Sequence, residues 1–250
     1  MRDFVVDTTD NRMMYVGMRL VERGYTVVDY ENYSGENSAI YIFSPAKSLN
    51  VEDIGCINIG SSVCAGRMRE DLASILLARD ITYLDILSDE VYAYENAMYT
   101  AEVAIMLIVR NTTLSLSDMN VLILGYGRVG KAMANVLCAL NVKFAIAARR
   151  YEERASAYLV TSDIRTLEDS MDGYDVIVNT IPARIIDRAR MNDIKSDTYV
   201  LDLASYDVMD RAEACEHDIN YAVEHGLPGR YVPRSAGDSL ARSVLRTLEV

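Results

Sequence analysis

The stretch that decides the fold is "VLILGYGRVGKAMANVL", residues 121–137. Its apolar start predicts a buried strand, and Gly125, Gly127 and Gly130 follow with GxGxxG spacing before an alanine-rich helix. In this setting the first glycine permits a tight turn, the second lets the backbone approach a pyrophosphate, and the third lets helix and strand pack closely. The stretch therefore predicts a dinucleotide-binding turn with a helix N-terminus facing the phosphates.

The next predicted strand, "KFAIAARR" at residues 143–150, ends in Arg149 and Arg150. A carboxylate at this place would accept hydrogen bonds from the ribose of NAD, whereas the planar fork of an arginine matches a 2′-phosphate. The pair therefore favours NADP over NAD as the cofactor. The alternative is that one or both arginines simply point into water.

Further apolar runs, "YDVIVNT", "TYVLDLA" and "INYAV", alternate with helical segments, which predicts a doubly wound parallel sheet. Ligands bind at the carboxyl ends of such strands, so the turns "NTIP" and "DLAS" are expected to border the ribose and nicotinamide. The predicted cofactor-binding residues are Gly125, Tyr126, Gly127, Arg128, Val129, Gly130, Arg149, Arg150, Thr180, Ile181, Pro182, Leu203, Ala204 and Ser205.

The N-terminal part alternates short apolar runs with amphipathic stretches, and Met14, Met18 and Val21 recur there at helical spacing. A segment without Gly or Pro follows, with Ser88 as its expected N-cap, and predicts one long helix whose inner face lines an interdomain cleft. We thus predict two α/β domains joined by a long helix: a flavodoxin-like domain at 1–87, the connector at 88–113, a Rossmann domain at 114–233, and a C-terminal helix at 234–250 that packs back on the first domain.

Composition narrows the function classes. The net charge of −12 argues against nucleic-acid binding, which relies on clustered Lys and Arg. No apolar run is long enough to cross a membrane, and "MRDFVVDTTD" has no signal-peptide core, so a cytoplasmic protein is expected. The four cysteines lack CxxC spacing and nearby histidines; we expect buried or half-buried free thiols and no metal site.

Four segments in order, "LILGYGRVGKAMANVL", "DVIVNTIPARIID", "LDLAS" and "HGLPGRYVPRSAG", resemble the A subunit of bacterial dipicolinate synthase. The architecture also resembles, more distantly, D-2-hydroxyacid dehydrogenases and the cofactor domain of adenosylhomocysteine hydrolases. The resemblance implies an NAD(P)-dependent oxidoreductase that converts a dihydrodipicolinate-type precursor to dipicolinate during sporulation, with a flavoprotein-like B subunit. Related two-domain dehydrogenases pair through their cofactor domains, so a dimer or other homo-oligomer is expected.

A small dicarboxylate substrate requires positive charge and oriented donors. The segment "HGLPGRYVPRSAG" supplies Arg230, Arg234 and Ser235 just before the last predicted helix. Ser235 is expected to cap that helix, whose N-terminus favours anions, and Arg234 is the preferred carboxylate partner.

Two residues are candidates for the base that removes a proton. His225 precedes the "GLPG" segment, and an imidazole titrates near neutral pH. Glu102 lies in the apolar stretch "AEVAIMLIV", where a carboxylate requires a partner or a raised pKa. On the connector helix it is expected to face the cleft together with the substrate-binding candidates Asn96 and Thr100.

Two other functions remain open. The first is a catalytically silent NADP-binding subunit of a larger complex. The second is a D-2-hydroxyacid-type dehydrogenase, although Ser205 stands where that enzyme class has an arginine.

Overall fold

A computed structural model describes residues 3–249 of the chain, which forms two compact units. Unit 1 comprises the residues up to Asn96 and those from Pro228 onward, and unit 2 comprises Ala97–Leu227. The long helix α4 (Glu90–Asn111) covers most of the predicted connector, and the division between the units falls inside it. The predicted domain boundaries stay a prediction.

Unit 1 is built on a five-stranded parallel sheet with the strand order β2-β1-β3-β4-β5, an order typical of flavodoxin-like folds. Strand β1 is buried along its whole length, and its alternate side chains point into two separate cores, Phe4 and Val6 into one and Val5 into the other. The strands are β1 (Phe4–Val6), β2 (Val27–Asp29), β3 (Ile40–Ile42), β4 (Ser62–Ala65) and β5 (Thr82–Asp85).

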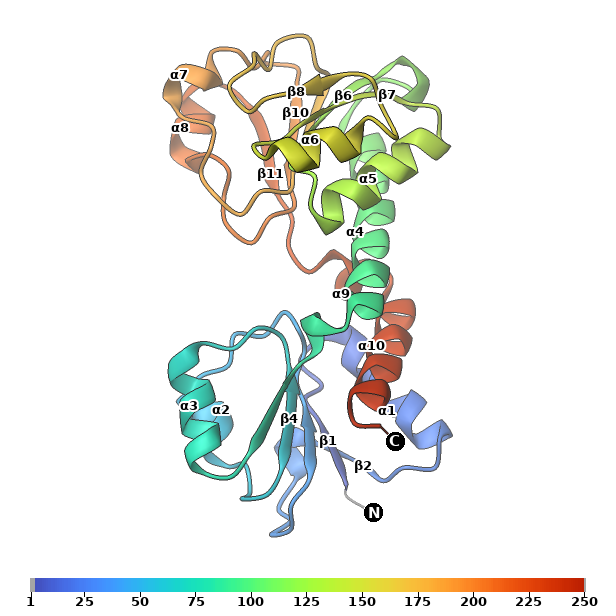
Figure 1. The fold of residues 1–250 in the computed structure, drawn as a ribbon, viewed down its shortest axis with the longest axis vertical. Coiled ribbons are helices and arrows are strands. Elements are labelled where there is room, and N and C mark those ends of the chain that lie inside the picture. The colour runs from blue at the N-terminus through green and yellow to red at the C-terminus, as the bar shows by residue number, and fades with distance from the viewer. Residues whose placement is uncertain (1–2, 250) are drawn as a thin grey trace. The chain divides into compact units, whose positions relative to one another are not determined.

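Helices cover both faces of this sheet (Figure 1), with α1 and α10 on one face and α2 and α3 on the other. The C-terminal helix α10 packs along α1 and contributes Leu240, Ala241 and Val244 to their shared core. The helical segments of this unit are α1 (Asn11–Glu22), α2 (Val51–Gly55), α3 (Glu70–Ala78), α9 (Leu227–Tyr231) and α10 (Pro233–Thr247), with short 3-10 turns η1 (Tyr30–Asn32) and η2 (Ile86–Ser88).

Unit 2 is a six-stranded parallel sheet with the order β11-β10-β9-β6-β7-β8, so the predicted fold class of two α/β domains with a doubly wound second sheet is confirmed. The central strand β6 carries the glycine turn, and α5 begins at Arg128. The elements are β6 (Asn120–Leu124), β7 (Lys143–Ala147), β8 (Ile164–Arg165), β9 (Val176–Asn179), β10 (Tyr199–Asp202), β11 (Asn220–Val223), η3 (Leu116–Asp118), α5 (Arg128–Ala139), α6 (Tyr151–Ala157), α7 (Arg188–Met191) and α8 (Arg211–Glu216).

Two predicted helix caps are wrong. Ser88 ends the turn η2, and the side chain of Asp89 instead accepts from the backbone N–H groups of Val91 (2.9 Å) and Tyr92 (3.3 Å). Ser235 lies inside the first turn of α10, because that helix already begins at Pro233, whose fixed φ suits the first helical position.

Met14, Met18 and Val21 of α1 are all more than half exposed, and the buried face of this helix carries Met13 and Val16. The predicted burial of the cysteines needs correction. Of the four free cysteines only Cys64 is buried, and the others are exposed.

Candidate cofactor site

The glycine turn after β6 has the geometry that a bound dinucleotide requires. Gly125 adopts φ +96°, and a Cβ on it would lie 2.6 Å from the Thr180 hydroxyl. A Cβ on Gly130 would lie 2.2 Å from the carbonyl oxygen of Gly125, so this glycine permits the close packing of α5 on the turn. Gly127, the N-cap residue of α5, has no heavy atom of the described residues within 4 Å of a Cβ position. The backbone at the start of α5 is therefore open to a ligand.

A cavity of about 370 Å³ lies over this turn, within unit 2. It brings together three turns that follow β6, β7 and β9, at the carboxyl edge of the sheet where a doubly wound fold binds its ligand. Its lining residues are Gly125, Tyr126, Gly127, Arg149, Arg150, Glu153, Leu167, Thr180, Ile181, Pro182, Ala183 and Ile185.

Most of the predicted cofactor residues line this cavity, but two groups do not. Arg128, Val129 and Gly130 form the first turn of α5, and the segment from Leu203 to Ser205 follows β10. Sequence reasoning missed Glu153, Leu167, Ala183 and Ile185. The spacing from Arg150 to Glu153 is the one signal that could have identified Glu153, because residues three apart on a helix are neighbours.

The two arginines at the end of β7 differ in their surroundings. The Nε of Arg150 donates to the carboxylate of Glu153 at 3.0 Å, and its Nη2 donates to the same oxygen. This hydrogen bond and the charge of Glu153 raise the pKa of Arg150. Arg149 is exposed, and its backbone carbonyl accepts a hydrogen bond from the guanidinium of Arg154.

The turn "NTIP" after β9 is shaped by its own side chains. Asn179 is fully buried; its amide donates to the Ile181 carbonyl (3.0 Å) and its Oδ1 accepts from the Ile181 N–H (3.0 Å). The hydroxyl of Thr180 donates to the Leu124 carbonyl at 2.9 Å, which ties this turn to the strand before the glycine turn.

A buried carboxylate joins the turns after β9 and β10. Asp202 is fully buried and accepts hydrogen bonds from the Asn179 amide (2.7 Å), the backbone N–H groups of Ala204 (3.1 Å) and Val208 (2.7 Å), and the Tyr221 hydroxyl (2.8 Å). Burial and the hydrogen bond to Asp202 raise the pKa of Tyr221, which therefore stays a neutral donor. The network holds the start of the "DLAS" turn in place.

The two candidate bases have different surroundings. Glu102 is exposed on α4, so the apolar environment expected for it is wrong. Asn96 and Thr100 are half-buried one helical turn apart, but a residue six positions from Asn96 points roughly 120° away from it, and Glu102 does not share their face. His225 is exposed just after β11, where its charge adds to the hydrogen bond from Arg211 in lowering the pKa of Asp207.

The predicted carboxylate-binding residues lie around the start of α10, in unit 1. The guanidinium of Arg230 lies 5.2 Å from the ring centroid of Tyr231. Arg234 and Ser235 are exposed in the first turn of α10, whose N-cap residue Val232 makes no side-chain capping bond. Their role in substrate binding stays a prediction.

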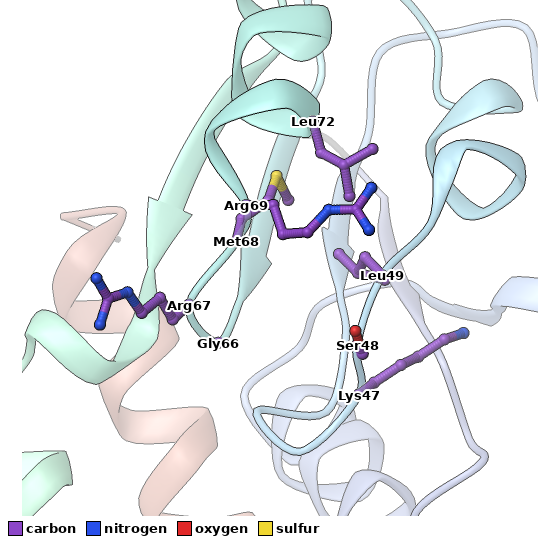
Figure 2. A pocket seen from close by; sticks show the side chains of 8 residues that line it. All are labelled: Lys47, Ser48, Leu49, Gly66, Arg67, Met68, Arg69 and Leu72. Carbon is purple, nitrogen blue, oxygen red and sulfur yellow. The ribbon is translucent and has the colours of Figure 1, made fainter. Parts of the chain in front are cut away.

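A second, much smaller cavity of about 20 Å³ lies in unit 1 between the loops that follow β3 and β4 (Figure 2). Lys47 pairs with Asp7 (3.0 Å) and Asp53 (3.1 Å), and Arg69 pairs with Asp71 (3.0 Å), so carboxylates offset these charges. Arg67 points away from the cavity. A space of this size holds roughly one water molecule, so this cavity is too small for a cofactor.

Among residues 3–249, no group of three or more His, Cys, Asp or Glu side chains is arranged to hold a metal ion. None of the helices formed by these residues is both long and apolar enough to cross a membrane.

Comparison with protein families matches residues 81–217 to the model described as "D-isomer specific 2-hydroxyacid dehydrogenase, NAD binding domain". The match covers more than half of the 250 residues and includes the three turns around the cavity. The cavity is therefore that of a dehydrogenase-type domain that binds a nicotinamide cofactor.

Individual relatives agree with the predicted resemblance, which is confirmed. The A subunit of dipicolinate synthase from Bacillus subtilis is 30% identical over 164 residues, which are 64% of this chain and 55% of that relative. The crystal structure of the corresponding dipicolinate synthase protein from Bacillus halodurans superposes with a TM-score of 0.88 at 22% identity, covering 100% of this chain and 98% of that one. D-lactate dehydrogenase from Escherichia coli gives a TM-score of 0.70 at 14% identity, with 100% and 96% covered.

Proposed function

This chain belongs to the family of D-isomer specific 2-hydroxyacid dehydrogenases through its NAD binding domain, and from that premise we propose that it oxidises a dihydrodipicolinate-type precursor to dipicolinate with NADP. The main observation behind the proposal is that Arg149, Arg150 and the glycine turn line the same cavity. The sequence similarity to the A subunit of dipicolinate synthase supports the substrate class, although the match spans only 55% of that relative.

The choice of NADP rests on the charges at the end of β7. In an NAD site an acidic residue at this place accepts hydrogen bonds from the ribose, but here the position is held by two exposed guanidinium groups. Arginine donors suit the planar oxygens of a phosphate. The open N-terminus of α5 at Gly127 would receive the pyrophosphate.

The oxidation removes a hydride and a proton from the substrate ring, and a bound nicotinamide supplies the hydride acceptor. We assign the proton to His225, because an imidazole is a common proton acceptor in enzymes and this one is exposed just after β11, at the carboxyl edge of the sheet. Glu102, exposed on α4, is the second candidate for this base.

We assign the two substrate carboxylates to the start of α10. Arg234 offers an exposed guanidinium in the first turn, next to Ser235 and close in sequence to Arg230. The unsatisfied N–H groups of a helix N-terminus add positive potential there. Asn96 and Thr100, half-buried on α4, are the further substrate-binding candidates.

The proposed partner is a second, flavoprotein-like protein of the dipicolinate synthase B type. It is suggested by the name of the relative, which is one of the subunits of a synthase. A homo-oligomer, a cytoplasmic location and a role in sporulation are proposed on the same resemblance. A catalytically silent NADP-binding subunit is the second candidate, because both proposed bases are exposed.

Cofactor titration tests the phosphate assignment. In Arg149→Ala, NADPH should bind about tenfold more weakly, since the substitution removes a charge-assisted contact, and in Arg150→Ala the loss should be smaller, because Arg150 also pairs with Glu153. NADH affinity should stay unchanged in both variants. Arg188→Ala is the matched control, because Arg188 is equally exposed but pairs with Glu216 outside the cavity. Equal affinity for NADPH and NADH that neither arginine substitution changes would exclude the assignment.

A further inference from the structure

We propose that Glu153 sets the cofactor preference of this cavity by competing with the 2′-phosphate of NADP for the guanidinium of Arg150. The inference rests on the proposed function, and it assigns a role to a carboxylate that neither the glycine motif nor the arginine pair predicts. It concerns only residues of unit 2 that line the same cavity.

Glu153 is positioned for this role by the short helix α6. The helix begins at Tyr151, directly after the turn that carries the arginine pair, and the carboxylate of its third residue turns back toward Arg150. The side chain of Glu153 is 20% exposed, whereas that of Arg150 is 69% exposed. The carboxylate is therefore the more buried member of the pair, and the arginine is the one that solvent or a ligand can reach more easily.

The pair occupies the donors that a phosphate would use. Both Nε and Nη2 of Arg150 point at one oxygen of Glu153, and these two groups form the side of the guanidinium fork that suits a phosphate. A phosphate can use this side of Arg150 only if this bond is shared or broken. The negative charge of Glu153 would also repel the phosphate dianion.

Arg149 can bind a phosphate without first losing a bond to Glu153. Arg154 donates to the carbonyl oxygens of Ala148 (2.8 Å) and Arg149 (2.6 Å), which fixes the backbone of the turn and leaves the Arg149 side chain exposed. Within the described residues 3–249, Arg149 forms no ion pair. Arg149 is thus the first phosphate partner, and Glu153 limits how much Arg150 adds.

The test is to titrate the Glu153→Gln variant with NADPH and with NADH, and to measure binding by fluorescence or calorimetry. Glutamine keeps an oxygen that can accept from Arg150 but loses the charge, so the guanidinium is released to the phosphate. NADPH should bind about threefold to tenfold more tightly than to the original chain, while NADH affinity stays the same. Added salt should reduce the gain, because the groups are partly exposed.

Glu152→Gln is the matched control, since it removes the same charge from the neighbouring residue of α6, which does not line the cavity. Its effect on NADPH affinity should be less than about twofold, as expected for a screened surface charge. An unchanged or weaker NADPH affinity in Glu153→Gln overturns the inference, and so does an equal gain in Glu152→Gln.

Arg149→Ala separates failure of this inference from failure of the proposed function. If Arg149→Ala weakens NADPH binding but Glu153→Gln leaves it unchanged, only the role of Glu153 is wrong. If the original chain binds NADPH and NADH equally and Arg149→Ala changes neither affinity, both the NADP assignment and the role of Glu153 are wrong.

Discussion

Asp10 is the N-cap residue of α1 and the centre of a small polar cluster in unit 1. It accepts from the backbone N–H and the Nε of Arg12, and from the Ser44 hydroxyl at 2.8 Å. Burial alone would raise the pKa of Asp10, but the charge of Arg12 and these hydrogen bonds outweigh it and hold that pKa below its usual range. Because Arg12 is 3% exposed, loss of the carboxylate leaves a buried charge unpaired.

Asp10→Asn should therefore lower the free energy of unfolding by about 2–4 kcal/mol at neutral pH. A lowered folded-state pKa contributes stability that is present above the unfolded-state value, about 3.9, and is lost as pH falls through the folded-state pKa. The difference between Asp10→Asn and the original chain in urea unfolding should thus shrink as pH falls below that range. A difference that grows on acidification would contradict the assignment. Asp71→Asn, which removes an exposed ion pair with Arg69, should have little effect.

Single residues of the cavity were predictable to different degrees. Arg149 and Arg150 follow an apolar strand at the expected distance from the glycines, so chain spacing alone places them near the cofactor. Glu153 was missed because the direction of its side chain depends on how helix α6 is turned about its own axis. The apolar environment of Glu102 was wrong because neighbours in sequence do not share a helix face.

At the scale of elements, the packing of α10 on α1 depends on Gly237. A Cβ at this position would lie 2.4 Å from the carbonyl oxygen of Arg12 and 2.7 Å from the Cβ of Tyr15. Gly237→Ala should therefore lower the free energy of unfolding by about 1–3 kcal/mol, since the two helices must move apart. Thermal or urea unfolding measures the change.

Gly17→Ala is the matched control on α1. A Cβ there would lie 3.6 Å from the nearest side-chain atom, of Val27, which is an ordinary contact. The same substitution should then raise stability by about 0.5–1 kcal/mol, because alanine favours the helix interior. Equal effects of the two substitutions would contradict the proposed close approach of α10 to α1.

The same helix pair explains which features of the elements the sequence could predict. Helix α1 itself was predictable from apolar spacing, but its buried face was not, because both of its faces carry apolar side chains and α10 arrives from the far end of the chain. The strands of unit 2 were predictable from their apolar runs, except β8, whose two residues are too few to form a pattern. The predicted start of α10 was wrong because it relied on Ser235 as the helix N-cap, although Pro233 is itself a residue typical of the first helical position.

At the scale of the whole molecule, two parallel sheets follow from alternating strands and helices, and the order of strands follows from right-handed crossovers. The nicotinamide cofactor follows from the glycine turn and its family match. Substrate and partner do not follow from fold, because the same doubly wound architecture serves many reactions. Which substrate and partner bind depends on the side chains that contact them, and these side chains come from separated parts of the chain.

We propose that this chain oxidises a dihydrodipicolinate-type substrate with NADP. The most direct measurement incubates the purified chain with dihydrodipicolinate and NADP, with and without a B-type partner, and follows both reduced nicotinamide and dipicolinate. We predict that the two products appear together in equal amounts, and faster with NADP than with NAD. Bound NADP with neither product formed, in the presence or absence of the partner, would contradict the claim and favour the silent NADP-binding subunit.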